Sequence, residues 1–443
     1  MPQPRPTDGR SAGERISEGR DPLPGSSVNR NIRLLAFGVG VRMLGNALYG
    51  PFIALYLHNV LSIGYVELGL IIVFIGTIQI PFGILGGLVS DRMSRKTLMI
   101  VGLATEAAVT GLLAYAFSIE SLVLAIAAAI VGGSISSLAG PAFSAYIADF
   151  VEGSERTRGF TMYRIGFNAG YAAGVALGGL FITVIGFAGG VAIAAAIIAG
   201  AAGILYTFLE PSARDLDEGP KARTAPPVAA PPHSPPRRSL GESLRILAKD
   251  RVALEVALAF ALASFVAAQW SIIFPLYVHN ILGVSYSLLG AGLALNGLVV
   301  VFGQSATTER VIGWRHTSIG LLGLMLYGVA FLGLGAAGLW NTLPVVVFFV
   351  SVVVLTLGEN LVAIPSSTLP SNLAPKGEVG SYNGAFNAIG AIGFLTATLA
   401  GGVVLAFVTN PLLIWILLLV PAVPAIVLLR HAGGRIPDKM NRA

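Results

Sequence analysis

Four ionisable side chains lie within long apolar stretches of this sequence: Arg42, Glu106, Glu255 and Glu359. Ionised groups are expensive in a lipid bilayer, and those that occur there usually serve ion or substrate pathways or pair with one another. Desolvation favours the neutral form of a carboxyl group, whereas a neighbouring arginine favours the charged form. A carboxyl group that meets and leaves an arginine would therefore bind and release a proton.

The composition places these side chains in a membrane protein. Of 443 residues, 55% are hydrophobic and 11% are charged, whereas a soluble domain is about 25% charged. Such a chain is neither a soluble enzyme with one buried core nor a disordered protein. It contains no cysteine and only five histidines, so we expect no disulfide, no metal site and no cofactor.

Twelve stretches are long and apolar enough to cross a membrane as helices, which takes about 20 residues each. They are 32–58, 66–90, 97–117, 122–148, 159–184, 188–208, 251–280, 287–307, 316–338, 343–369, 380–406 and 411–430. We therefore expect an all-α membrane protein with twelve transmembrane helices.

The basic residues predict the orientation of these helices. Lysines and arginines occur on alternate connections, and the six connections on the other side carry none. The positive-inside rule then places both termini and the central loop in the cytoplasm. The positive charges are dispersed along one side of the membrane rather than gathered into one patch, so we expect no nucleic-acid partner. Arg42 is the one basic residue well inside a span, and Arg164 lies just within the start of the fifth.

The polar segments divide the chain into two halves. Residues 1–30 lack the apolar core of a signal peptide, and we interpret them as a disordered cytoplasmic tail. The Pro-rich segment 211–245 is interpreted as a cytoplasmic linker. It separates a six-helix half at 31–210 from a second at 246–430, and a short tail follows at 431–443.

An internal repeat relates the two halves. LYLHNVLSIGYVELG at 55–69 aligns with LYVHNILGVSYSLLG at 276–290, with eight of fifteen positions identical at an offset of 221 residues. Both segments begin at the outer end of the first span of a half. Two parallel, pseudo-symmetric halves are one design of transporters, in which the binding site lies at the interface of the halves.

The loop after the second span resembles a signature of the major facilitator superfamily. It reads GLVSDRMSRK, and a second family pattern follows the fourth span. The matching residues are Gly87, Asp91, Arg92, Arg95 and Lys96 in the first pattern and Asp149, Glu155 and Arg156 in the second. The resemblance implies a tight cytoplasmic turn that acts as a gate, in which Asp91 caps a helix and pairs with an arginine across the interface. The alternative is that these charges only set the orientation.

The resemblance also implies which spans line the cavity, namely the first, fourth, seventh and tenth. Arg42 and Glu359 would then reach the cavity at similar depth from opposite halves. Our hypothesis is that they pair, directly or through water or substrate. Proton binding to Glu359 would then release Arg42, or the charge of the substrate would replace one partner. The alternative is a static ion pair. We expect Glu106 to bond to a neighbouring span and Glu255, near the membrane surface, to be structural.

Several polar and aromatic residues in the expected cavity spans are candidates for substrate contact. They are Asn46, Tyr49, Gln79, Gln269, Trp270, Asn296, Asn168 and Asn387. Each could equally form a hydrogen bond between helices. In the fifth span, GYAAGVALGG at 170–179 keeps the glycines of the drug-antiporter motif but has Val175 in place of its proline. Small residues at this spacing also allow close helix packing.

These features predict a secondary transporter that works by alternating access in the cell membrane. No ATP-binding motif is present, so we expect a proton gradient to supply the energy. We expect a monomer that exports small drug-like or amphipathic molecules and is not an enzyme. One alternative is the uptake of a sugar, organic anion or other metabolite, with Arg42 binding a carboxylate. Another is a membrane receptor or lipid-handling protein on the same scaffold.

Overall fold

The computed structural model of the chain describes residues 25–90, 92–151, 153–211, 240–341, 343–375 and 377–442. These residues form helices and no strand, apart from an isolated bridge between Arg315 and Arg442. The expected all-α class is confirmed. The predicted tail at 1–30 and the linker at 211–245 lie mostly outside the described residues.

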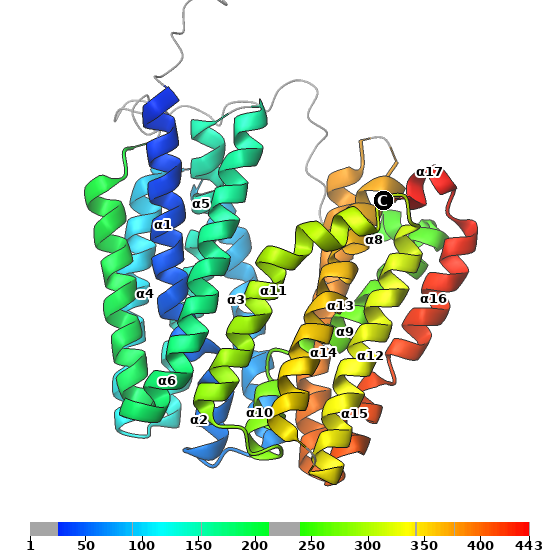
Figure 1. Cartoon of the computed structure of the whole chain (residues 1–443). Coiled ribbons are helices and arrows are strands. Elements are labelled where there is room, and N and C mark those ends of the chain that lie inside the picture. Colours follow the sequence, from blue (N-terminus) through cyan, green and yellow to red (C-terminus); the bar gives the residue numbers. More distant parts are fainter. Residues whose placement is uncertain are drawn as a thin grey trace, which may run out of the picture.

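The first half consists of long helices joined by short turns (Figure 1). They are α1 (Gly25–Tyr49), the 3-10 turn η1 (Gly50–Phe52), α2 (Ile53–Asn59), α3 (Tyr65–Ser90), α4 (Arg95–Ser118), α5 (Leu122–Phe150) and α6 (Gly153–Phe208). The 56-residue α6 contains two spans, because Gly186 within it has φ 76°, a left-handed conformation that interrupts the helix.

The second half follows the same order (Figure 1). Its helices are α8 (Leu240–Lys249), α9 (Arg251–Ala268), α10 (Ile273–Asn280), α11 (Tyr286–Arg310), α12 (His316–Trp340), α13 (Pro344–Leu373), α14 (Val379–Phe407), α15 (Pro411–Leu419), α16 (Ala422–Arg435) and α17 (Asp438–Asn441). Within the described residues, ten helices are long and apolar enough to span a membrane. Sequence analysis predicted twelve spans. The two counts differ because α6, which contains two of the predicted spans, is counted once and because α1 is not counted.

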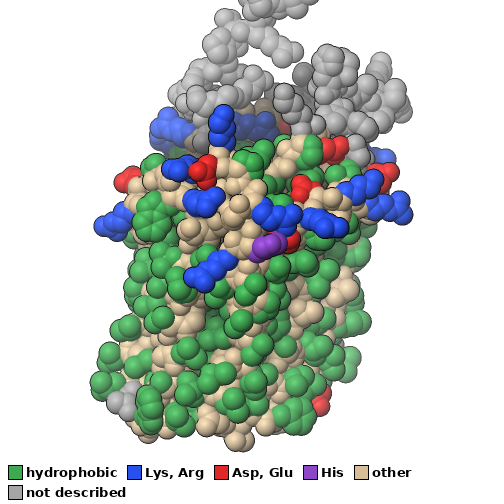
Figure 2. All heavy atoms as spheres, turned by 90° about the vertical axis from the view of Figure 1, so that its right-hand side faces the viewer, with side chains coloured by type: hydrophobic (Ala, Val, Ile, Leu, Met, Phe, Trp, Pro, Cys, Tyr) green, Lys and Arg blue, Asp and Glu red, His purple; other side chains and the backbone are tan. Residues whose placement is uncertain are grey.

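The two ends of the bundle differ in charge. Figure 2 shows lysine and arginine side chains gathered at one end, whereas the flank below them is mostly hydrophobic. We call this the basic end, and Figure 1 shows that α8, α17 and the C-terminus lie there. The opposite end, which we call the far end, contains the turns between α2 and α3 and between α10 and α11.

The first span of each half is broken toward its far end, where a long helix is followed by a short one. In the first half, η1 interrupts the span at Pro51, which has no N–H to donate to a helical hydrogen bond. In the second half, residues 269–272 separate α9 from α10. The repeat offset carries 51 to 272, so the two breaks are equivalent. Broken helices of this kind often border the binding sites of transporters.

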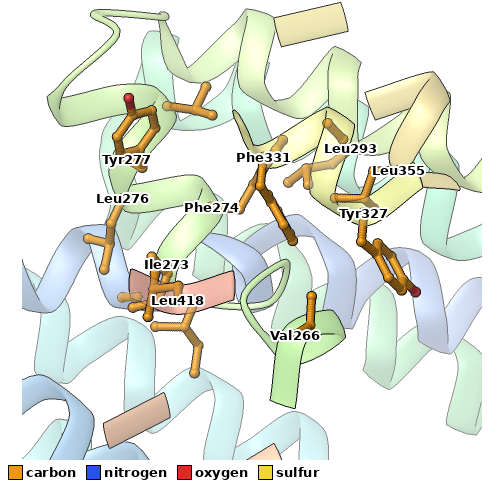
Figure 3. Close-up of a cluster of buried hydrophobic side chains, with 14 of the residues drawn as sticks. Val266, Ile273, Phe274, Leu276, Tyr277, Leu293, Tyr327, Phe331, Leu355 and Leu418 are labelled. Carbon is orange, nitrogen blue, oxygen red and sulfur yellow. The ribbon is translucent and has the colours of Figure 1, made fainter. Parts of the chain in front are cut away.

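The second break is held by a dense apolar core (Figure 3). Phe274 and Tyr277 just after the break are fully buried. Tyr277 also donates a hydrogen bond to the carbonyl oxygen of Leu334 in α12, at 3.1 Å. Phe331 of the same helix stacks on Trp415 of α15 with ring centroids 4.5 Å apart. The break therefore has a fixed shape rather than being a flexible link.

Glycines allow α1 and the first part of α6 to pack backbone to backbone. A Cβ atom at Gly166, Gly170, Gly174 or Gly178 would collide with a backbone oxygen of α1. Three of these glycines belong to the antiporter-like segment 170–179. Close helix packing thus accounts for the glycines of this segment.

We predict that Gly170→Ala destabilises the protein by about 1–3 kcal/mol, the usual effect of overpacking. Its Cβ would collide with the carbonyl oxygen of Gly40. Gly203→Ala is the matched control. Gly203 lies on the same helix as Gly170, but a Cβ there would meet no atom within 4 Å. Thermal unfolding of both variants in detergent would test this. Equal midpoints for the two variants would contradict the packing account.

Candidate functional site

A central cavity of about 490 Å³ lies between the two halves. Both broken spans border it, through Pro51 on one side and Ser271 on the other. Among the residues predicted to contact substrate or carry a proton, those that line this cavity are Asn46, Asn168, Trp270, Asn296 and Glu359. This cavity lies at the interface of the halves, where the repeat predicts a binding site.

A side chamber of about 330 Å³ adjoins the central cavity, lined mostly by the first half and also by Ser271 and Ile272 of the second. Tyr49, Gln79 and Glu106 line this chamber. Of these, Tyr49 and Gln79 are among the residues that the sequence suggests for substrate contact. Asn46 and Pro51 line both spaces. The two spaces therefore meet at the break in the first span.

A vestibule of about 560 Å³ leads from the basic end toward the central cavity. Arg164 of α6 and Glu309 of α11 line it from opposite halves, and Arg164 donates a hydrogen bond to Gln304 at 3.3 Å. Asn168 lines both the vestibule and the central cavity. Figure 1 shows the helices of the two halves spreading apart at the basic end and converging at the far end. The cavity is therefore open toward the basic end.

Arg42 forms a buried ion pair with Glu106. Its Nε and Nη2 atoms donate to the two carboxylate oxygens at 2.9 and 3.3 Å, and both residues are 6% exposed. Arg42 also donates to the Ser136 hydroxyl at 2.5 Å and lies 5.3 Å from the Phe143 ring centroid. Asn46 donates to Glu106 at 2.8 Å. This network joins α1, α4 and α5 and satisfies both charges within one half.

The predicted direct pair between Arg42 and Glu359 is wrong for this conformation. Arg42 points toward α4, where Glu106 supplies both of its carboxylate contacts. The expectation that Glu106 bonds to a neighbouring span agrees with this geometry. The guanidinium is consequently neutralised and buried, and it does not line the central cavity.

Glu359 lies in a different environment. Asn296 of α11 donates one hydrogen bond to its Oε2 atom, at 3.1 Å, and another to the hydroxyl of Thr356, at 2.8 Å. No lysine, arginine or histidine of the described residues lies within ion-pair distance of this carboxyl. Among the described residues that line the central cavity, Glu359 is also the one Asp, Glu, Lys, Arg or His. Within the described part of the chain, Glu359 is therefore the single acidic group of the cavity, and it has no cationic partner there.

Glu255 forms ion pairs at the basic end of the second half. His431 Nδ1 lies 2.9 Å from its Oε2, and Arg435 donates to its Oε1 at 2.7 Å. These contacts tie α9 to α16. They agree with the expected structural role and place Glu255 outside the central cavity.

Two of the predicted substrate contacts are not at the cavity. Gln269 is 1% exposed and donates to the backbone oxygens of Phe265 and Ala397, so it joins α9 to α14 instead. Asn387 is exposed on α14 and does not line the three spaces described above. The amide of Gln269 thus satisfies helix backbone, as polar side chains in membrane spans often do.

The signature residues near the basic end form contacts within the first half. Arg95 lies 3.5 Å from Asp149 and donates to Ser90 at 2.6 Å, which ties the start of α4 to the end of α5. Ser94 caps α4 by accepting a hydrogen bond from the N–H of Thr97. Arg92 and Arg156 are exposed, Lys96 is half-buried, and a Cβ at Gly87 would meet no atom within 4 Å. Asp91 and the side chain of Glu155 lie outside the described residues, so the contact of Asp91 across the halves stays a prediction.

Sequence analysis missed Tyr171, Ser136 and Thr356. Tyr171 lines the central cavity, and it follows Asn168 by three residues on one face of a helix. That spacing could have identified Tyr171 as a further cavity residue. Ser136 and Thr356 gave none, because a hydroxyl in a span usually bonds to its own helix backbone.

Two halves built of long apolar helices around a central cavity are the architecture of a multi-pass membrane transporter. The family model of the Major Facilitator Superfamily matches residues 35–398, so the chain belongs to that superfamily of small-molecule transporters and is not an enzyme. Relatives include an MFS-type transporter of Bacillus subtilis named YttB, 24% identical over 385 residues, which cover 84% of this chain and 88% of that protein. The quinolone resistance protein NorA of Staphylococcus aureus is 24% identical over 157 residues, 35% of this chain and 39% of NorA.

The fold also matches solved structures of transporters. A POT family transporter in complex with a thioalcohol-conjugated peptide superposes with a TM-score of 0.71 at 14% identity. The match covers 92% of this chain and 97% of that one. At this identity the likeness establishes the fold alone.

We predict that the Arg42–Glu106 pair stabilises the first half. Glu106→Gln leaves a buried arginine without a counter-charge and should destabilise the protein by about 3–5 kcal/mol. The double variant Arg42→Gln with Glu106→Gln removes both charges and should recover most of that loss. Thermal unfolding of both single variants and the double variant would measure the coupling. Additive losses would contradict the pair.

Proposed function

We propose that this protein exports small amphipathic cations from the cytoplasm in exchange for protons, by alternating access. In this proposal the basic end faces the cytoplasm, as the distribution of lysines and arginines indicates. The observation that carries it is the state of the two deep charges. Arg42 is neutralised by Glu106, and Glu359 has no cationic partner among the described residues.

The charge balance of the cavity supports a cationic substrate. An ionised carboxylate in a closed, dry cavity is costly unless a counter-charge or a proton neutralises it. A cation and a proton therefore compete for Glu359, and the transporter can change conformation at low cost only with one of them bound. This competition links the movement of protons to the movement of substrate in opposite directions.

The walls of the cavity support a flat apolar body on that cation. Phe167 and Tyr171 line it from α6, and Trp270 lines it from the break in the second half. Aromatic faces attract cations as well as apolar rings. Asn168 and Asn296 add a few polar contacts, the usual pattern of a small-molecule site.

The same geometry counts against uptake of an organic anion through Arg42. Both carboxylate contacts of the guanidinium are already made by Glu106. A substrate carboxylate would have to displace this partner and would approach Glu359 as a like charge. The partial similarity to NorA, a quinolone resistance protein, agrees with export of drug-like compounds.

We predict that Glu359→Gln abolishes the accumulation of a lipophilic cation driven by a pH gradient. The glutamine cannot exchange a proton, so the gradient no longer drives the cycle, while exchange of a neutral amphipathic probe continues. Proteoliposomes with an imposed pH gradient, to which tetraphenylphosphonium is added from outside, provide the measurement. Glu120→Gln, at an exposed glutamate of the far end, is the control and should behave as the parent. Undiminished gradient-driven accumulation by Glu359→Gln would rule out this residue as the proton carrier.

We further predict selectivity for charge at constant shape. Tetraphenylphosphonium and tetraphenylborate have nearly the same size and opposite charge. Purified protein should bind the cation at least tenfold more tightly, because attraction to Glu359 is replaced by repulsion for the anion. Tighter binding of the anion would instead favour a substrate site at Arg42.

A further inference from the structure

The repeated sequence segments meet at the far end of the molecule, between the two halves. Each contains a His-Asn pair followed by a tyrosine: His58, Asn59 and Tyr65 in the first, and His279, Asn280 and Tyr286 in the second. All six residues lie in or beside the turns that follow α2 and α10. Neither the cavity nor the charged residues described above account for this repetition.

Each histidine fixes the shape of its own turn. His58 Nδ1 lies 2.7 Å from the carbonyl oxygen of Ile63, and His279 Nδ1 lies 2.8 Å from that of Val284. A carbonyl oxygen only accepts, so Nδ1 carries the proton in both rings. The first imidazole stacks on Tyr65 with ring centroids 3.9 Å apart. The second imidazole stacks on the tyrosine of its own turn at 4.0 Å, with the same interplanar angle of 22°.

The backbone repeats with the side chains. Ser62 and Gly283 occupy equivalent positions at the repeat offset, and both have positive φ, 56° and 69°. A serine in this region is strained, so the turn is held by its surroundings rather than by local preference. The two turns therefore have the same built conformation.

The asparagines connect the two turns to each other. Asn59 Nδ2 donates to Asn280 Oδ1 at 3.1 Å and lies 3.3 Å from the Tyr286 hydroxyl. In return, Asn280 Nδ2 donates to the Tyr65 hydroxyl at 3.4 Å. Asn59 and Asn280 are equivalent in the repeat, and equivalent residues touch each other only at a two-fold axis. We call this set of three hydrogen bonds the clasp.

Close helix contacts flank the clasp on both sides. A Cβ at Gly290 of α11 would lie 2.5 Å from the carbonyl oxygen of Val175 in α6. On the other side, a Cβ at Gly402 of α14 would collide with the carbonyl oxygen of Tyr65 at the start of α3. The halves are thus in backbone contact around the clasp, while the vestibule at the basic end is open.

We propose that the clasp is the gate that closes the central cavity at the far end, and that it must open in every transport cycle. His58 and His279 are positioning residues that present the asparagines and tyrosines across the axis. The type of contact suits this task. Three hydrogen bonds between partly exposed side chains close the path at a modest free energy, because water replaces each bond when the halves separate.

Cysteine accessibility tests this proposal, because the parent chain contains no cysteine. Ser271→Cys places one thiol at the broken span, where it lines both the central cavity and the side chamber. A membrane-impermeant maleimide labels it from the medium in whole cells and from the cytoplasmic side in inside-out vesicles. Adding Asn280→Ala removes two of the three clasp bonds. Labelling from the medium should rise about 2- to 13-fold for each bond of ordinary strength removed.

The direction of the change separates a gate from a general loss of structure. Opening the far end closes the basic end, so labelling from the cytoplasmic side should fall as labelling from the medium rises. Gly402→Ala should act in the same direction, because its collision with Tyr65 exists only while the far end is closed. Asn410→Ala is the matched control, since Asn410 caps α15 within one half and should leave both rates unchanged.

Two outcomes would overturn the proposal. Unchanged labelling in both Asn280→Ala and Gly402→Ala would show that these contacts do not hold the far end closed. A rise from both sides would show loosened structure instead of gating. Labelling needs no substrate and no proton gradient, so the result does not depend on the role proposed for Glu359.

Discussion

The neutralisation of Arg42 by Glu106 determines how the rest of the cavity behaves. Among the described residues, Arg42 carries the one guanidinium deep in the apolar region, and the pair neutralises it within the first half. Asn46 donates a further hydrogen bond to Glu106, and Ser136 accepts one from Arg42. The carboxyl of Glu359 is left with Asn296 as its hydrogen-bond partner and with the central cavity beside it. In the proposed function, either a proton or a bound cation neutralises the charge of this carboxyl when the cavity closes. The coupling that we propose between two fluxes follows from that choice.

The duplicated architecture supplies the movement that such coupling needs. Equivalent breaks interrupt the first span of both halves and border the central cavity, while equivalent turns meet beyond them at the far end. At the far end the hydrogen bonds of the clasp are arranged about a two-fold axis, and close backbone contacts between the halves flank them. The vestibule at the basic end has polar walls from both halves, including Arg164 and Glu309. Each end therefore has a surface that can close and open as the halves rotate.

The fold was predictable from the sequence because it depends on regional properties. The fold follows from three features of the sequence: the length of the spans, the alternation of basic connections and the 221-residue repeat. None of these depends on how a helix is rotated about its axis. Which side chains line the site does depend on the rotation of each helix about its axis. Successive residues of a helix differ by about 100° in direction, so Met43 faces the central cavity whereas Arg42 faces α4. The sequence shows that Arg42 is deep in a span, but not which neighbouring helix its guanidinium meets. The same argument explains why Gln269 points into a helix contact while Trp270 lines the cavity.

The central claim is that a cation and a proton exclude each other at Glu359. Proton release on binding measures this directly, with purified protein in a weakly buffered detergent solution and tetraphenylphosphonium as the added cation. The account predicts a release that approaches about one proton per bound cation at a pH where the acid is protonated, and no release from Glu359→Gln. Release that persists in Glu359→Gln, or cation binding by the parent without any release across the pH range, would contradict it.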